Sequence, residues 1–286
     1  MSNPVSASST DAPAPTGTVR TVRLASILGA DSVPAPDPTE DYHEASRIYA
    51  GVTDPNVVGG VRLERSIEMR ITASRSVKRY PQRPFVPLPA ASLGRATLAG
   101  AVAARRSRRS FGPRPLELSR IATLLHAAYG VTAAIDGTPQ SLRTVPSGGA
   151  LYPLELYVVS HRVEGLDQAL YHYDPLRHGL ELLRPLASPA GPELSPYAEP
   201  LAESAAIVVM TAMFWRSRFK YGARAYRFAL MEAGHVGQNL LLAAAAIGLD
   251  AVPIGGFYDR EVDAFMGVDG IYEASLYLVP LGHPST

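Results

Sequence analysis

The stretch Pro146–Pro153, with the sequence Pro-Ser-Gly-Gly-Ala-Leu-Tyr-Pro, leads directly into Leu154–Ser160, a run of mostly apolar residues. This run is rich in branched and aromatic residues and follows a proline, which predicts a strand. The paired glycines, Gly148 and Gly149, let a backbone approach a flat ligand closely, and exposed amides there can donate to its heteroatoms. A plain glycine turn before a strand has the same pattern, so the stretch alone leaves both interpretations open.

Outward from this strand, the sequence predicts an α+β domain. Four more runs of branched and aromatic residues predict strands, at residues 169–173, 180–184, 205–211 and 275–281. The first two of the four flank a turn-like cluster and predict a hairpin. Apolar residues at helical spacing predict helices over residues 118–128, 224–247 and 259–266. We therefore expect an antiparallel or mixed sheet with helices packed on it.

The N-terminal part of the chain differs in composition from the rest. Residues 1–40 are rich in proline, alanine and small polar residues, which predicts a disordered tail before a folded domain at residues 41–286. Prolines also break any regular element between Arg79 and Ala90 and predict an extended surface segment there.

Composition excludes several classes of function. A net charge of +1 gives no global field that would hold the protein on nucleic acid or on an anionic membrane. The chain has no cysteine, which excludes disulfides, thiolate nucleophiles and sulfur-bound metals, and His172 and His178 lack a third metal ligand at a credible spacing. The N-terminus has no secretory signal pattern. The longest apolar stretch, Leu240–Leu249, is about half of what a bilayer crossing needs. We expect a cytoplasmic protein without a metal.

A basic segment, Arg105–Phe111, has the sequence Arg-Arg-Ser-Arg-Arg-Ser-Phe. Its guanidinium groups repel one another unless an anion or carboxylates compensate them. Arginine presents paired N–H donors that match phosphate oxygens, and serine adds a hydroxyl. The segment therefore predicts a phosphate site, with a solvated basic face or a weak nucleic-acid patch as alternatives.

A second pair of glycines occurs in Gly248–Phe257, where a predicted helix ends and an apolar connection reaches Gly255 and Gly256. The backbone at this pair could contact a ring. Helix capping at Gly248 and a turn at Gly255 are the alternative explanation.

The order of these three segments resembles that of the nitroreductase superfamily, and the closest likeness is to the SagB-type dehydrogenases, over about Tyr42 to His283. Three stretches are similar to that subgroup in particular, namely residues 42–46, 150–155 and 232–235. The resemblance implies a three-layer sandwich with a mixed or antiparallel sheet flanked by helices, an intertwined homodimer and an FMN cofactor. The small residues of the helix at 224–247 would form the dimer core. Its polar residues are interpreted as satisfied groups of a buried helix, and this applies to Glu232, His235, Gln238 and Asn239.

The resemblance also assigns cofactor-binding roles. It implies that Arg105 and Ser107 hold the FMN phosphate and ribityl chain, and that Arg109 faces the pyrimidine edge of the flavin, where a cation favours the reduced state. Gly255 and Gly256 would lie beside the flavin N5. Loop residues would approach the flavin from the partner subunit, and these are Pro146, Ser147, Gly148 and Gly149. Many nitroreductases have a C-terminal basic residue at the phosphate, which this chain lacks, so the candidate replacements are Arg106, Arg108 and His283.

Lys220 and Tyr221 match a Lys-Tyr pair that serves proton transfer in azoline oxidases of this family. Removing hydrogen from an azoline takes a hydride from one ring atom and a proton from its neighbour, so a base is required. Lysine acts as a base only when neutral, and the nearby Arg216, Arg218 and Arg224 are expected to lower its pKa. Without the family context, an exposed basic segment with one core tyrosine would explain the same residues.

The leading hypothesis is an FMN-dependent dehydrogenase that oxidises thiazoline or oxazoline rings to thiazoles or oxazoles in a peptide natural product, in a possible complex with cyclodehydratases. An NAD(P)H-dependent nitro or quinone reductase would use the same flavin site. A non-catalytic scaffold, whose arginine cluster binds an acidic leader peptide, is the alternative from a different class.

Overall fold

The computed structural model describes residues 37–48, 50, 77–136, 140–191 and 193–285, which form two units divided between Arg47 and Ile48. The first unit contains helix α2, Pro38–Ala45, whose N-cap Asp37 accepts a hydrogen bond from the Thr39 amide. Helix α2 thus begins inside the segment that the sequence predicts as a tail. Residues 1–36 of that predicted tail lie outside the described residues.

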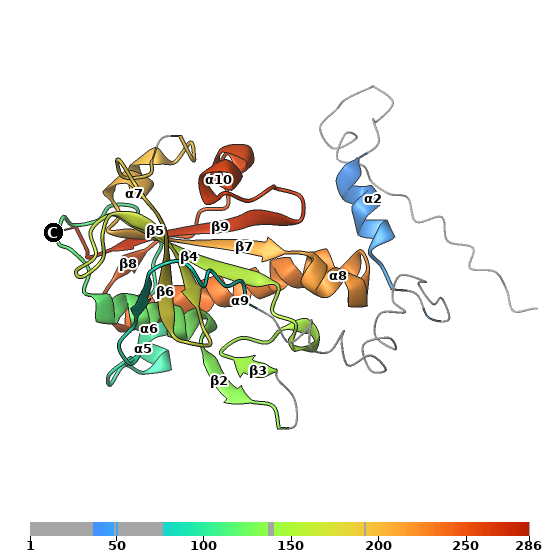
Figure 1. Cartoon of the computed structure of the whole chain (residues 1–286), viewed down its shortest axis with the longest axis horizontal. Coiled ribbons are helices and arrows are strands. Elements are labelled where there is room, and N and C mark those ends of the chain that lie inside the picture. Colours follow the sequence, from blue (N-terminus) through green and yellow to red (C-terminus); the bar gives the residue numbers. More distant parts are fainter. Residues whose placement is uncertain (1–36, 49, 51–76, 137–139, 192, 286) are drawn as a thin grey trace, which may run out of the picture. The chain divides into compact units, whose positions relative to one another are not determined.

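The second unit is built on a seven-stranded antiparallel sheet (Figure 1). In spatial order the strands are β1 (Phe85–Pro87), β6 (Gly179–Pro185), β5 (Ala169–Asp174), β4 (Leu154–Ser160), β7 (Ala206–Met213), β9 (Glu273–Gly282) and β8 (Asp250–Ala251). A separate two-stranded sheet pairs β2 (Val131–Ala134) with β3 (Ser141–Arg143). All five strands predicted from the sequence are therefore confirmed, and the predicted hairpin is the antiparallel pair β5–β6.

The proline-rich segment between Arg79 and Ala90 is extended as predicted, but the prediction that it holds no regular element is wrong. Strand β1 lies within it and pairs with β6, with Val86 opposite Leu180. An edge strand needs hydrogen bonds on only one side, so it tolerates neighbouring prolines that a central strand would not.

Helices cover both faces of the sheet, which gives the predicted three layers (Figure 1). One face carries α5 (Leu98–Ala104), α6 (Leu118–Tyr129) and α9 (Arg224–Ala246), and the other carries α7 (Ala198–Glu203) and α10 (Asp259–Met266). Strand β4 alternates between the two cores, because Leu156 and Val158 pack with the first set of helices whereas Tyr157 and Val159 pack with the second.

The small residues of helix α9 were predicted to form the dimer core, but most of them pack inside the chain itself. Ala229, Ala233 and Ala244 are buried in the chain's own core, and a Cβ at Gly237 would lie 3.0 Å from the ring of Tyr277. These residues therefore let α9 approach its own sheet and helices. The exposed face of α9 has larger side chains, Tyr226, Leu230 and Met231. Across the described residues, no helix combines the length and the apolar character that a bilayer crossing requires.

Candidate functional site

The basic segment follows the end of helix α5 and lies along strand β8. Thr97 caps the start of α5 by accepting a hydrogen bond from the Gly100 amide, and Arg105 follows the last helical residue. Ser107 then forms a parallel bridge with Ala251, and the Arg108 amide donates to the Ala251 carbonyl at 3.1 Å. These bonds bring the basic segment beside the chain that leads to Gly255 and Gly256.

The two segments enclose a small polar cavity of about 240 Å³. Arg109 lines it together with Tyr197, Gly255 and Gly256. The Gly256 carbonyl accepts a hydrogen bond from the Ser195 hydroxyl at 2.7 Å, which fixes the second glycine. A Cβ at Gly255 would meet no atom within 4 Å, so the space in front of this backbone is open.

The first glycine pair lies in a tight loop that ends where β4 begins. Gly148–Ala150 form a short 3-10 turn, and the Ser147 hydroxyl accepts a hydrogen bond from the Tyr152 amide at 2.9 Å. Gly149, Ala150 and Tyr152 all have positive φ angles, of 64°, 52° and 46°. Left-handed backbone at alanine and tyrosine is strained, and such strain is concentrated at functional sites. The loop is therefore more strained than a plain glycine turn.

Lys220 and Tyr221 lie against this loop. They end helix α8, Trp215–Tyr221, which the sequence did not predict as a helix. A Cβ at Gly149 would lie 2.8 Å from the Tyr221 hydroxyl and 2.9 Å from Lys220 Nζ, and a Cβ at Gly148 would lie 3.4 Å from the Tyr221 ring. The two glycines thus allow the Lys220–Tyr221 pair to contact the loop backbone.

A buried ion network holds helix α8 against the sheet. Arg216 pairs with the Glu155 carboxylate on β4, whose second oxygen is 2.7 Å from His172 Nε2. His172 Nδ1 in turn is 2.9 Å from Glu181. Burial alone would raise the pKa of Glu155, but Arg216 and His172 outweigh it and hold this pKa at about 2. Burial would lower the pKa of His172, and the two carboxylates raise it instead.

A second buried acid, Glu232, is a residue that the sequence interpretation excluded from the site. It projects from α9 and accepts a hydrogen bond from the Tyr129 hydroxyl at 2.6 Å. Burial raises its pKa to about 7, although hydrogen bonds from Ser147 and Tyr129 act in the opposite direction. No helical periodicity distinguishes Glu232 from an ordinary buried polar residue, because its partners come from distant segments.

The other candidate polar residues have structural contacts. Arg106 donates to the carbonyls of Ala103 and Arg105 at the end of α5. The His283 ring lies 3.5 Å from the Glu117 carboxylate. Burial alone would raise the pKa of Glu117, but a backbone hydrogen bond and nearby cations lower this pKa instead.

The Ser107 end of the basic segment and the loop with Gly148 and Gly149 lie far apart within one chain. Ala251 pairs with Leu281, and Leu281 pairs with Ala206 at one end of β7. At the other end of β7, the Met213 amide donates to the carbonyl of Pro153, the residue that ends the loop. The seven steps along β7 correspond to about 24 Å. One chain therefore keeps Ser107 and the loop at opposite ends of the sheet.

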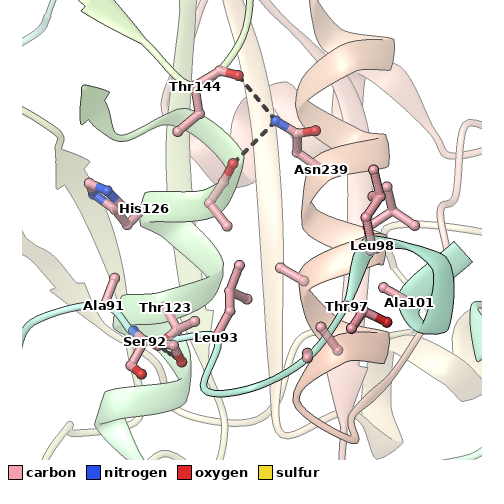
Figure 2. Close-up of a pocket in the computed structure, with 15 residues that line it drawn as sticks. Ala91, Ser92, Leu93, Thr97, Leu98, Ala101, Thr123, His126, Thr144 and Asn239 are labelled. Atoms are coloured by element: carbon pink, nitrogen blue, oxygen red, sulfur yellow. Dashed lines mark hydrogen bonds between the residues drawn. The ribbon is translucent and has the colours of Figure 1, made fainter. Parts of the chain in front are cut away.

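A larger, apolar cavity of about 500 Å³ lies between α5, α6 and α9 (Figure 2). Alanine and leucine side chains form most of its wall, and Asn239 donates to the carbonyls of Ala127 and Thr144. None of the residues predicted for the site lines this cavity. The predicted site residues therefore lie outside this cavity, near the Arg109 cavity or at the loop and the Lys220–Tyr221 pair.

Comparison with known proteins gives a consistent result. The nitroreductase family model matches residues 102–283. The protein MJ1384 of Methanocaldococcus jannaschii, whose name assigns it to the nitroreductases, is 38% identical over 181 residues, which cover 62% of this chain and 86% of that protein. The microcin B17-processing protein McbC of Escherichia coli is 36% identical over 149 residues, which cover 49% of this chain and only 54% of that protein.

A solved structure shows the same fold. A chain of the E. coli microcin synthetase complex McbBCD, determined with truncated pro-MccB17 bound, superposes with a TM-score of 0.56 at 26% identity. The superposition covers 87% of this chain and 92% of that chain.

Proposed function

This chain belongs to the nitroreductase family, whose members are generally FMN-dependent oxidoreductases, and we propose that it oxidises thiazoline or oxazoline rings in a peptide to thiazoles or oxazoles. The observation that carries this proposal is the contact of Lys220 and Tyr221 with the Gly148–Gly149 backbone. It combines a candidate base with a loop that a flat ring system can approach.

The residues around the Arg109 cavity fit FMN. Arg105 and Ser107 would bind its phosphate, because guanidinium and hydroxyl groups match phosphate oxygens. Arg109 supplies positive charge in the cavity that also contains Gly255 and Gly256. The open space at Gly255 admits a flat ring close to the backbone. Arg109 would stabilise the negative charge that reduction adds to the pyrimidine edge of the flavin.

The active form would be a homodimer. Because the loop and Ser107, the proposed phosphate ligand, lie at opposite ends of β7, both can contact one flavin only if two subunits contribute. The exposed apolar face of α9, formed by Tyr226, Leu230 and Met231, begins next to the Lys220–Tyr221 pair. Helix α5 adds two exposed apolar residues, Leu98 and Val102, beside the cavity of Figure 2. A second copy of the chain would cover these surfaces.

The proposed reaction divides the removal of hydrogen between two acceptors. Bound FMN would accept the hydride from one ring carbon of the azoline, and oxygen or another acceptor would later reoxidise the flavin. Lys220 would act as the base that takes the proton from the neighbouring ring atom, and Tyr221 would share it. The Glu155–Arg216 pair keeps α8, and therefore both residues, against the loop.

A peptide substrate is supported by the similarity to the microcin B17-processing protein and to the peptide-bound synthetase complex. Because that relative acts within a complex, we also propose that this chain works with cyclodehydratase partners that form the azolines.

The decisive variant is Lys220→Ala, with Arg218→Ala as its matched control on the same helix. Arg218 is exposed and lies over the Trp215 ring. We expect K220A to retain bound FMN and lose azole formation from an azoline peptide, whereas R218A retains both. Azole formation at the wild-type rate by FMN-loaded K220A would refute the proposed mechanism.

A nitro or quinone reductase is the second candidate, favoured by the similarity to MJ1384. Rapid anaerobic bleaching of the bound flavin by NADH or NADPH would support this reductase. Bleaching by an azoline peptide, and none by nicotinamides, is the result that our proposal predicts.

A further inference from the structure

Glu232 occupies an unusual position for a carboxyl group. It is 3% exposed, in the middle of the apolar contacts between α9 and the rest of the core. A buried carboxylate is costly unless hydrogen bonds satisfy it. Tyr129 provides one such bond, and the other partner is Ser147 in the loop that the proposed function assigns to the flavin.

The hydrogen-bond directions at Ser147 connect Glu232 to the backbone of the loop. The Ser147 oxygen already accepts from the Tyr152 amide. Because a hydroxyl has a single hydrogen, that hydrogen is left to donate to Glu232. Ala150 and Tyr152 hold strained left-handed conformations in this same loop, so the loop needs outside contacts to keep its shape.

We propose that Glu232 is a positioning residue for the loop of residues 146–153, in which its carboxylate holds the Ser147 hydroxyl and its protonation loosens the loop and weakens FMN binding. The part of this proposal that concerns FMN rests on the proposed function. The link between Glu232 and the loop does not.

Protonation of Glu232 falls in an accessible pH range. Burial raises the pKa to about 7, against the hydrogen bonds of Ser147 and Tyr129 and the positive charges of Arg143 and Arg216. Tyr129 comes from α6, Arg143 from β3 and Arg216 from α8, and the Arg143 guanidinium lies 4.1 Å from the centre of the Tyr129 ring. Between pH 6 and pH 8 the carboxyl therefore changes from mostly neutral to mostly ionised. Ionised acceptors form the stronger hydrogen bonds, so the loop is held more firmly at pH 8.

The first test measures FMN affinity by flavin fluorescence at pH 6, 7 and 8 for the full-length wild type, Glu232→Gln and Ser147→Ala. The phosphate of FMN titrates equally in all three proteins. A difference in the pH dependence of FMN affinity between wild type and E232Q therefore reports on the Glu232 carboxyl. We expect wild-type affinity to rise roughly fivefold more than that of E232Q between pH 6 and 8, which corresponds to one hydrogen bond of about 1 kcal/mol. S147A should show the same weak pH dependence as E232Q, because it keeps the Glu232 carboxyl but removes the hydrogen bond from Ser147. Identical pH dependence in wild type and S147A would overturn the proposal.

Tyr129→Phe serves as a second variant. Loss of its hydrogen bond removes an influence that lowers the pKa of Glu232, so the midpoint of the FMN affinity change should move to higher pH. An unmoved midpoint would show that another group titrates.

The second test needs no flavin. Hydrogen exchange in the peptide that covers residues 146–153, corrected for the intrinsic effect of pH, should show more protection at pH 8 than at pH 6 in wild type and equal protection in E232Q. Equal behaviour of the two proteins would contradict the role of Glu232 directly. A protein that binds no FMN at any pH but passes the exchange test would instead refute the proposed function alone.

Discussion

Gly149 is the residue at which the loop and the Lys220–Tyr221 pair meet, and it cannot be replaced without moving one of them. Gly149→Ala would add both left-handed strain and a Cβ within 3 Å of the Lys220 and Tyr221 polar atoms. Gly248→Ala is a matched control, because Gly248 has a φ of +72° but nothing within 4 Å. Each variant should lose about 1–2 kcal/mol of stability from backbone strain.

Only G149A should lose azole formation, by roughly 100-fold, because it displaces the proposed base. Urea unfolding and turnover of an azoline peptide check the two parts separately. Equal turnover in G149A and G248A would show that the contact with Gly149 does not matter for catalysis.

The second prediction at this scale concerns stability against pH. Burial raises the pKa of Glu232 above its unfolded value, so the folded state holds a proton there that the unfolded chain releases near pH 4.5. Its contribution to stability is therefore fully present below pH 4.5 and is lost as the pH rises through about 7. A shift of this size corresponds to roughly 3 kcal/mol. In thermal unfolding, the stability of E232Q relative to wild type should increase between pH 5 and pH 8. A constant difference in stability over this range would contradict the raised pKa of Glu232.

Single residues also show where the sequence was informative. The sequence was sufficient to select two glycine pairs as candidate site residues, because a glycine pair next to a strand or a helix end has few explanations. These pairs are Gly148–Gly149 and Gly255–Gly256. Glu232 could not be selected in this way, because its hydrogen-bond partners Tyr129 and Ser147 lie far from it in sequence.

Among the elements, the strands and long helices were predictable and the short ones were not. Strand β4 has the predicted bounds, and α9 ends within one residue of its prediction, because long apolar patterns reflect burial directly. Strand β1 has three residues among prolines, and α8 has seven residues of which three are cationic. Neither is long enough to show a periodic pattern of apolar residues from which it could be predicted. The small residues of α9 were identified correctly as sites of close approach, but the sequence could not show that the approach is to its own sheet.

Helix α8 yields the prediction at this scale, because its position depends on Arg216. Arg216→Ala would leave Glu155, which is 2% exposed, without its strongest cationic partner. Loss of one member of a buried pair costs about 3–5 kcal/mol, whereas the exposed Arg218→Ala should cost about 0.5 kcal/mol or less. Urea unfolding at pH 7 measures both. Similar losses in the two variants would mean that the Glu155 network does not anchor the helix.

For the whole molecule, the order of three short segments indicated the correct family and three-layer fold, but no spacing in the sequence gave the distances between them. The register of β7 separates the loop from the basic segment by its full length. That separation follows from the sheet order, which depends on long-range pairing. It is the reason why the proposed flavin site requires two copies of the chain.

The central claim is that one flavin is bound by the Arg109 cavity of one subunit and the loop of its partner. Arg109→Ala and Gly149→Val damage the two halves separately, and each homodimer should bind little FMN. A purified heterodimer that contains one copy of each variant retains one intact site, so FMN released on denaturation should amount to one molecule per two chains. A heterodimer without FMN, alongside a wild-type protein that binds it, would contradict the shared site.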